Sequence, residues 1–287
     1  MRKYNAWIKL LRIKHYIKNL IILFPMFFSK EITMSNVTTI LIGIIIFSLV
    51  SSMVYILNDI SDIAKDRIHP EKCNRPLPSG DLTVKEAKIG WIVIGVITCG
   101  LVFICNINYL GILIVIGYLL INIFYSKYAK NIPVMDVLIL AFGYLLRIFL
   151  GAVLINITIS NWLYLTVLFG SLFMGLGKRR GEMKYVDSNN TRKVLEFYNE
   201  EFLDKNMYMS LTITIVFYAL WCVSSEISSN YPHMVWTTIL AYAICMKYTL
   251  ILEKGSEGDP ISVIFSDRIL FGLLLLYSVV ILMIMYF

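Results

Sequence analysis

The sequence predicts an all-α, polytopic membrane protein. Hydrophobic residues make up 58% of the 287-residue chain and charged residues only 16%, and the mean hydropathy is +0.73. These values lie far outside the range of soluble globular proteins. The apolar residues gather in stretches of membrane-spanning length, and the basic residues gather in alternate segments between them. Both features indicate a multi-pass helical bundle.

Nine apolar stretches approach or reach the roughly 20 residues that cross the hydrocarbon core of a bilayer. The first is short and contains Pro25. We expect about nine transmembrane helices in a single integral membrane catalytic domain over residues 1–287. The stretches cover residues 16–29, 39–57, 89–106, 109–126, 134–155, 161–177, 208–225, 233–252 and 268–286.

Basic residues indicate which side of each stretch is cytoplasmic, because loops rich in Lys and Arg stay on that side. Nearly all of the 26 Lys and Arg residues precede or open the first stretch or fall within residues 65–88, 127–130, 178–205 and 247–268. Lys30 falls in an opposite-side loop and Arg147 lies inside the fifth stretch. The amino terminus is therefore predicted to be cytoplasmic and the carboxyl terminus outside, in a bacterial cell (inner) membrane.

The basic pI, near 9.0, follows from this topology signal, and we expect no nucleic-acid partner. The five cysteines include no C-x-x-C pair, and no histidine stands at ligand spacing to them. We expect them to be small core residues in a reducing compartment. The sequence does not fix the oligomeric state, and a homo-oligomer stays open.

The most informative polar segment follows the second apolar stretch. Asp59, Asp62 and Asp66, the aspartate triplet, are spaced three and four residues apart, so on a helix that continues the stretch they share one face. Crowded carboxylates suit a hard cation, and Mg²⁺ commonly completes its coordination with water and substrate phosphate oxygens. The segment predicts a magnesium-diphosphate site that faces the cytoplasm. A solvated loop with topogenic charge is the alternative, but charge alone does not require this spacing.

Basic residues follow the triplet at once, and their side chains suit phosphate groups. They are Arg67, His69, Lys72 and Arg75. Residues 75–80 then carry two prolines and Gly80, which predict a turn before a new helix near Thr83, with Glu86 at capping-box spacing.

A second polar loop, residues 178–207, opens with Lys178, Arg179 and Arg180, the basic cluster, followed by Glu182. The loop is predicted to be largely helical. The cluster suits a phosphate group, and a solvated loop with topogenic charge is again the alternative.

Three charged residues stand at or within the apolar stretches. An arginine at membrane depth costs about 2.5 to 3.5 kcal/mol on insertion scales, so Arg147 is predicted to face a polar cavity with an anionic partner, unless it snorkels or forms a structural ion pair. Asp136 lies near the cytoplasmic start of the same helix. It either binds substrate or interacts favourably with the helix dipole. Lys18 suits a substrate phosphate and lipid headgroups about equally.

These motifs resemble the UbiA-type intramembrane prenyltransferase superfamily. Residues 58–66 read N-D-x-x-D-x-x-x-D, which is similar to the first aspartate-rich motif of that superfamily. Within the superfamily the chain is more similar to the decaprenyl-phosphate phosphoribosyltransferase branch, nearly end to end. The matching stretches are residues 11–19, 59–76, 125–130, 136–152, 178–182 and 258–268.

The resemblance implies a helical bundle with a central, cytoplasm-facing cavity and Mg²⁺ held by the aspartate triplet. Ordinary members have a second aspartate-rich motif near the end of the sixth helix, where this chain has the basic cluster. A cationic cluster cannot hold a second magnesium ion, but it can hold another phosphate. The implied reaction is transfer of a 5-phosphoribosyl group from phosphoribosyl diphosphate to a polyprenyl phosphate in the bilayer, with release of diphosphate.

The resemblance also implies substrate contacts for fifteen residues outside the triplet. They are Lys18, Asn58, Arg67, His69, Lys72, Arg75, Tyr125, Lys127, Lys130, Asp136, Arg147, Lys178, Arg179, Arg180 and Glu182.

Two other functions stay open. A UbiA-type prenyltransferase that moves a polyprenyl group onto an aromatic acceptor such as 4-hydroxybenzoate is disfavoured by the replaced second motif. A non-catalytic lipid or ion transporter would account for Arg147 and Asp136, but it gives no reason for the aspartate triplet.

Overall fold

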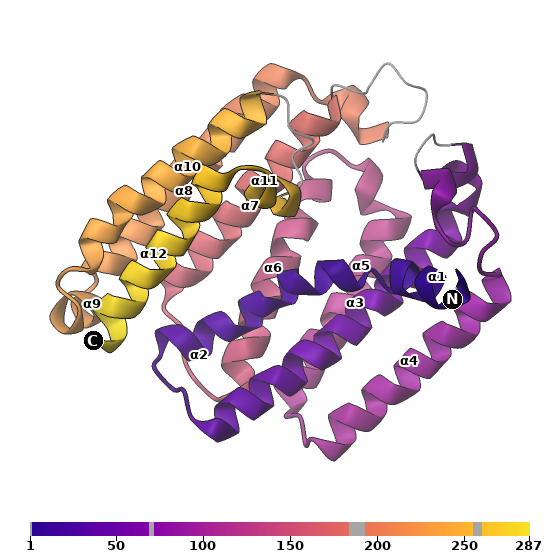
Figure 1. The fold of residues 1–287 in the computed structure, drawn as a ribbon, viewed down its shortest axis with the longest axis horizontal. Helices are drawn as coiled ribbons and strands as arrows, with labels where there is room; N and C mark the ends of the chain where they lie inside the picture. Colours follow the sequence, from indigo (N-terminus) through magenta and orange to yellow (C-terminus); the bar gives the residue numbers. More distant parts are fainter. Residues whose placement is uncertain (1, 69–71, 184–192, 255–259) are drawn as a thin grey trace. The chain divides into compact units, whose positions relative to one another are not determined.

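In the computed structural model every regular element is a helix, within residues 2–68, 72–183, 193–254 and 260–287, which the structure describes (Figure 1). The predicted all-α class is confirmed. The chain divides into two compact units. The first unit is Met1–Lys130 with Gly143–Ile159, and the second is Asn131–Phe142 with Ser160–Phe287. The single catalytic domain and the central cavity stay predictions.

The first unit is built around α3, a 35-residue helix that packs against α1, η1, α4 and α5. Two buried apolar clusters hold these elements together, one centred on Phe47 and one on Leu10 and Ile56. The elements are α1 (Arg2–Leu11), η1 (Ile13–Leu23), α2 (Phe24–Phe28), α3 (Met34–Ile68), η2 (Lys72–Asn74), α4 (Val84–Ile104), α5 (Tyr109–Lys127), η3 (Ala129–Asn131, which ends in the second unit) and the later part of α6 (Met135–Leu154).

The first apolar stretch is not one α-helix. An 11-residue 3₁₀ helix, η1, runs directly into the five-residue α2, which has Pro25 in its first turn. A 3₁₀ helix rises about 2.0 Å per residue and an α-helix about 1.5 Å, so the two together extend about 30 Å. That length matches the hydrocarbon core of a bilayer. The tighter winding therefore lets a stretch that is short for an α-helix reach across.

The turn and helix start after the triplet form as predicted. Gly80 adopts a φ of 79°, a conformation that favours glycine, within the turn before α4. The Thr83 hydroxyl accepts from the Glu86 backbone N–H, and the Glu86 carboxylate accepts from the Thr83 backbone N–H. This capping box fixes where α4 begins. Beyond it, α4 exposes apolar side chains such as Val96, 67% exposed, which suits a lipid-facing helix.

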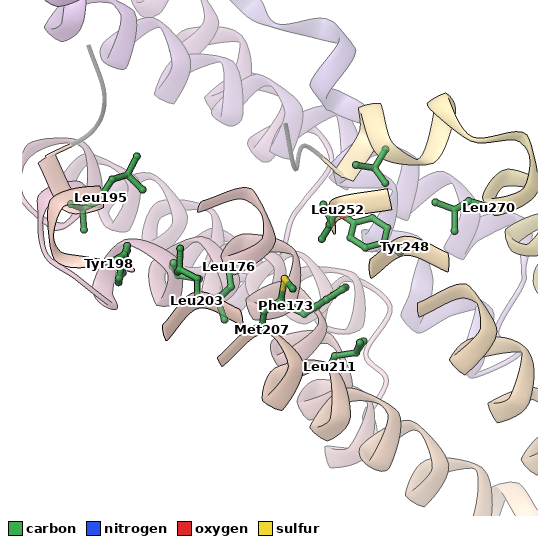
Figure 2. Close-up of a cluster of buried hydrophobic side chains, with 13 residues drawn as sticks. Phe173, Leu176, Leu195, Tyr198, Leu203, Met207, Leu211, Tyr248, Leu252 and Leu270 are labelled. Carbon is green, nitrogen blue, oxygen red and sulfur yellow. The ribbon is translucent and has the colours of Figure 1, made fainter. Parts of the chain in front are cut away.

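The second unit is a bundle in which α7 packs against α8, and α10 packs against α12. Figure 2 shows its buried core, where Phe173, Met207 and Tyr248 come together from α7, α8 and α10. The elements are the start of α6, α7 (Asn161–Met183), η4 (Lys193–Phe197), α8 (Glu200–Val223), α9 (Ser225–Asn230), η5 (Met234–Trp236), α10 (Thr237–Glu253), α11 (Pro260–Ser266) and α12 (Arg268–Tyr286).

Seven helices within the described ranges are long and apolar enough to cross a membrane: α3, α4, α5, α6, α8, η5 with α10, and α12. They correspond to seven of the nine predicted spans. The other two spans differ from these seven. The first stretch forms η1 and α2, each too short to count as a spanning helix, and α7 has 23 residues but is less apolar than the seven. The chain is a multi-pass integral membrane protein.

Candidate active site

The aspartate triplet lies on α3, which continues without a break to Ile68. The predicted helical extension beyond the apolar stretch is therefore confirmed. Asp59 and Asp66 are buried, at 2% and 4% exposed, whereas Asp62 is half-buried. Buried carboxylates need partners, since an isolated charge away from water is costly.

Two arginines supply partners for the buried carboxylates. Arg12 Nη2 donates to Asp59 Oδ1 at 2.6 Å. Arg75 Nη1 donates to Asp66 Oδ2 at 2.7 Å and lies 3.5 Å from Asp59 Oδ1, so one guanidinium bridges two carboxylates a full seven residues apart on the helix. Arg75, which the sequence assigns to a substrate phosphate, thus contacts the triplet in the structure, and Arg12 joins it.

The third carboxylate and the start of the motif are tied to α5 and η3. Lys130 Nζ donates to Asp62 Oδ1 at 2.9 Å. The Ser126 hydroxyl hydrogen-bonds Asn58 Oδ1. Asn58 therefore positions the motif, and its amide oxygen is used inside the protein.

The donor chemistry of the triplet suits Mg²⁺, which prefers carboxylate oxygens. Across the described residues, no three acidic, histidine or cysteine side chains converge closely enough to hold a metal ion. The carboxylate oxygens instead face Arg12, Arg75 and Lys130. Metal binding would exchange these cations for the ion, and the same cations would then face the phosphate oxygens that the ion brings.

The remaining predicted residues of the first unit differ in how exposed they are. Arg67 is exposed near the end of α3, and Lys72, the first residue of η2, is half-buried. Tyr125 is buried on α5, and Lys127 is exposed at its last residue. Lys18 is half-buried in η1. His69 lies outside the described residues.

Arg147 is buried without the predicted anionic partner, because no carboxylate in the described ranges pairs with it. Its Nε donates to Asn19 Oδ1 at 2.8 Å, its Nη1 to the Gly143 carbonyl at 2.7 Å, and its Nη2 to the Tyr118 hydroxyl at 3.2 Å. The guanidinium also lies over three aromatic rings, which attract a cation. These are the rings of Phe47, Tyr118 and Tyr144, at 4.9 to 5.2 Å.

In the second unit, Arg179 and Asp136 form a fully buried network. Arg179 Nε donates to Asp136 Oδ2 at 2.6 Å, and its Nη1 donates to Glu182 Oε2 at 2.7 Å. The Tyr198 hydroxyl donates to Asp136 Oδ1 and accepts from the Val134 backbone N–H, both at 2.6 Å. Burial and the neighbouring carboxylate raise the pKa of Tyr198 to about 12, so the phenol keeps its proton and stays a donor near neutral pH.

The three members of the basic cluster therefore differ. Arg179 is 0% exposed and engaged by two carboxylates, so its contacts are those of a positioning residue. Arg180 is half-buried, and its Nε donates to Asp204 Oδ1 at 2.5 Å. Lys178 is also half-buried, at the preceding position of α7.

Sequence reasoning missed Arg12, Tyr198 and Asp204. Arg12 stands 47 positions before Asp59, and Tyr198 stands 62 positions after Asp136. No local spacing pattern links residues so far apart. The one signal for Arg12 was that it falls in the matching stretch at residues 11–19.

The family model of the UbiA prenyltransferase family matches residues 20–266. The decaprenyl-phosphate phosphoribosyltransferase of Corynebacterium glutamicum is 31% identical, over 98% of this chain and 87% of the relative. The enzyme of the same name from Mycolicibacterium smegmatis is 28% identical, over 93% of this chain and 88% of the relative.

Solved structures show the same fold. A UbiA homolog from Archaeoglobus fulgidus bound to GPP and Mg²⁺ has a TM-score of 0.69 at 18% identity, over 96% of this chain and 98% of that chain. Because the identity is low, this likeness shows the fold alone. Together with the family match, this likeness confirms the predicted helical membrane architecture, and the chain belongs to the UbiA prenyltransferase family.

Proposed function

We propose that this protein transfers a 5-phosphoribosyl group from phosphoribosyl diphosphate to a polyprenyl phosphate and releases diphosphate. A phosphate oxygen of the lipid forms a bond to the anomeric carbon, and the bond from that carbon to the diphosphate oxygen breaks. The diphosphate leaves with the electron pair. The lipid phosphate is already an anion near neutral pH, so no general base is needed.

The choice of donor is carried by one observation, the basic cluster at the end of α7. The resemblance implies acidic residues at this place in ordinary prenyltransferases of the superfamily. The choice of donor is supported by relatives named decaprenyl-phosphate phosphoribosyltransferase that match nearly the whole chain. A phosphoribosyl donor and a lipid phosphate carry two phosphomonoesters besides the diphosphate, so such a substrate pair calls for more cations than a prenyl diphosphate does.

The aspartate triplet would hold Mg²⁺ against the leaving diphosphate. The ion would supply charge neutralisation as the bond to carbon breaks. Arg75 and Lys130 already touch the triplet, and with Arg67 and Lys72 they would bind diphosphate oxygens. Several cations around one leaving group favour its departure, because they act where negative charge develops.

The basic cluster would bind a second phosphate group, with Lys178 and Arg180 as the contacts and Arg179 as the residue that holds the segment in place. The active site would face the cytoplasm, where phosphoribosyl diphosphate is soluble, while the isoprenoid tail stays in the bilayer. The amino terminus would lie on the cytoplasmic side and the carboxyl terminus outside.

The test is the reaction itself. Purified protein in lipid nanodiscs is incubated with Mg²⁺ and phosphoribosyl diphosphate labelled in the ribose, with a polyprenyl phosphate as acceptor, and the lipid product is extracted. We expect label in the lipid only when Mg²⁺ and the lipid phosphate are both present. Formation of prenylated 4-hydroxybenzoate from a prenyl diphosphate, with no transfer of label to lipid, would establish the prenyltransferase alternative instead.

A further inference from the structure

A pocket of about 330 Å³ lies beside the aspartate triplet within the first unit. Its volume falls at the lower end of small-molecule sites, roughly 300 to 1,000 Å³. The lining comes from two places, the amino-terminal helices and the segment around η2. The lining residues are Lys9, Arg12, His15, Asp59, Asn74, Arg75 and Pro76.

The charge of this lining favours an anion. Lys9, Arg12 and Arg75 bring three permanent positive charges, and Asp59 brings one negative charge. Arg12 and Arg75 engage Asp59, and Arg75 also engages Asp66, so two carboxylates offset two of the three positive charges. One positive charge remains, and Lys9 supplies it. A site with more charged hydrogen-bond donors than acceptors is suited to binding phosphate.

Arg12 lies at this wall in an unfavourable backbone conformation. Its φ is 53° and its ψ is 46°, the left-handed region that non-glycine residues seldom adopt. This conformation marks the corner between α1 and η1, and it brings the guanidinium over the Tyr55 ring at 4.7 Å and onto Asp59. Strain of this kind, of the order of 1 to 3 kcal/mol, persists where surrounding contacts over-determine it, and it clusters at functional sites.

We propose that this pocket is a subsite for a phosphomonoester, with Arg12 as its principal contact and Lys9 beside it. The inference rests on the proposed function, which provides two such groups: the 5-phosphate of the sugar donor and the phosphate of the lipid acceptor. We assign the pocket to their shared chemistry, a terminal phosphate that accepts from a guanidinium. The position next to Asp59 would set that phosphate beside the metal-diphosphate group.

The test measures binding without turnover. Full-length protein in nanodiscs is titrated with ribose 5-phosphate and, separately, with farnesyl phosphate, in chelator so that the triplet holds no metal. Arg12→Gln removes the principal contact, and Lys9→Gln removes a pocket charge that has no carboxylate partner among the described residues. Lys14→Gln is the matched control, because Lys14 is exposed in η1 and does not line the pocket.

We expect both pocket variants to lower the affinity for one of the two ligands by about tenfold or more. The control should bind both ligands as wild type does. Weaker binding of ribose 5-phosphate would show that the pocket binds the phosphate of the sugar donor. Weaker binding of farnesyl phosphate would show that it binds the phosphate of the lipid. Thermal melts accompany each variant, and if Arg12→Gln lowers the melting temperature, Lys9→Gln decides. Unchanged affinity of both ligands in the variants, or no binding of either ligand to wild type, would overturn the subsite. Product formation by wild type is a separate measurement, so the proposed reaction stands or falls independently.

Discussion

Arg179 and Asp136 form an ion pair that solvent hardly reaches, with Arg179 Nε 2.6 Å from Asp136 Oδ2 and side-chain exposures of 1% and 0%. Removing one partner of such a pair leaves an uncompensated buried charge, which typically costs about 3 to 5 kcal/mol. We therefore expect Arg179→Ala to lower the free energy of unfolding by that amount. The neighbouring Arg180 pairs with a partly exposed Asp204. We expect Arg180→Ala to lower the free energy of unfolding by about 1 kcal/mol or less.

The measurement is thermal or denaturant unfolding of both variants in the same detergent. Lys205→Ala is the control, since Lys205 and Glu201 form an exposed pair on α8. Equal stability of the Arg179 and Arg180 variants would contradict the buried pair. It would also restore Arg179 as a residue available to substrate.

This pair illustrates what the sequence does and does not predict. The triplet, its helical continuation and the Thr83 capping box follow from spacings of three and four residues, and the structure has them. The sequence also predicted Arg179 and Asp136 as polar residues of interest, but not that they neutralise one another, because no periodicity links positions 43 residues apart. The 3₁₀ winding of residues 13–23 was missed for a different reason, since an apolar run fixes burial without fixing the pitch of the helix.

Metal dependence should pass through the aspartate triplet. Asp62→Asn keeps the size of the side chain and removes its charge, and Asp62 is half-buried and pairs with Lys130. We expect activity to fall by at least about a hundredfold, the scale of losing one electrostatic contact in a reaction centre, with the melting temperature near that of wild type. Activity is measured against Mg²⁺ concentration. Asp81→Asn, at a half-buried aspartate shortly before α4, controls for general loss of charge. Turnover that persists in chelator would refute the metal-diphosphate interpretation.

Membrane topology can be tested at the two stretches that lack an ordinary apolar α-helix. If η1 with α2 crosses the bilayer, a reporter fused at Ser35 lies outside, and one fused after Lys72 lies in the cytoplasm. If α7 also crosses, a reporter fused after Lys130 is cytoplasmic and one at Asn230 is outside. We expect signals of cytoplasmic exposure at Lys72 and Lys130 alone. A cytoplasmic signal at Ser35 would mean that residues 13–28 do not span.

The network around Arg147 should depend on the planar shape of the guanidinium and not on its positive charge alone. Arg147→Lys keeps a cation but cannot reach Asn19, Gly143 and Tyr118 with a planar fork. We expect it to lower the free energy of unfolding by about 1 to 3 kcal/mol, the cost of leaving buried polar groups unsatisfied. Asn19→Ala should have an effect of similar size, and the double variant should cost less than the sum, since the two share one contact. Full additivity in a thermal-unfolding series would show that they act separately.

The basic cluster offers the sharpest separation of the two enzyme functions. If Arg180 binds a phosphate that prenyltransferase substrates lack, Arg180→Ala should weaken donor or acceptor binding tenfold to over a hundredfold, for a contact worth roughly 1.5 to 3 kcal/mol. Affinity for Mg²⁺ should change little, because the triplet lies on another helix. The informative ligand is a ribosyl diphosphate without the 5-phosphate.

Wild type should discriminate against that analogue. The variant that replaces the residue holding the 5-phosphate should lose this discrimination. With two phosphomonoesters and two candidate subsites, Arg12→Gln and Arg180→Ala should fail on different ligands, one on the sugar phosphate and the other on the lipid phosphate. The same failure in both variants would contradict the assignment of two separate subsites. Discrimination that survives in both variants would show that other residues recognise the 5-phosphate, and it would remove the 5-phosphate from both subsites.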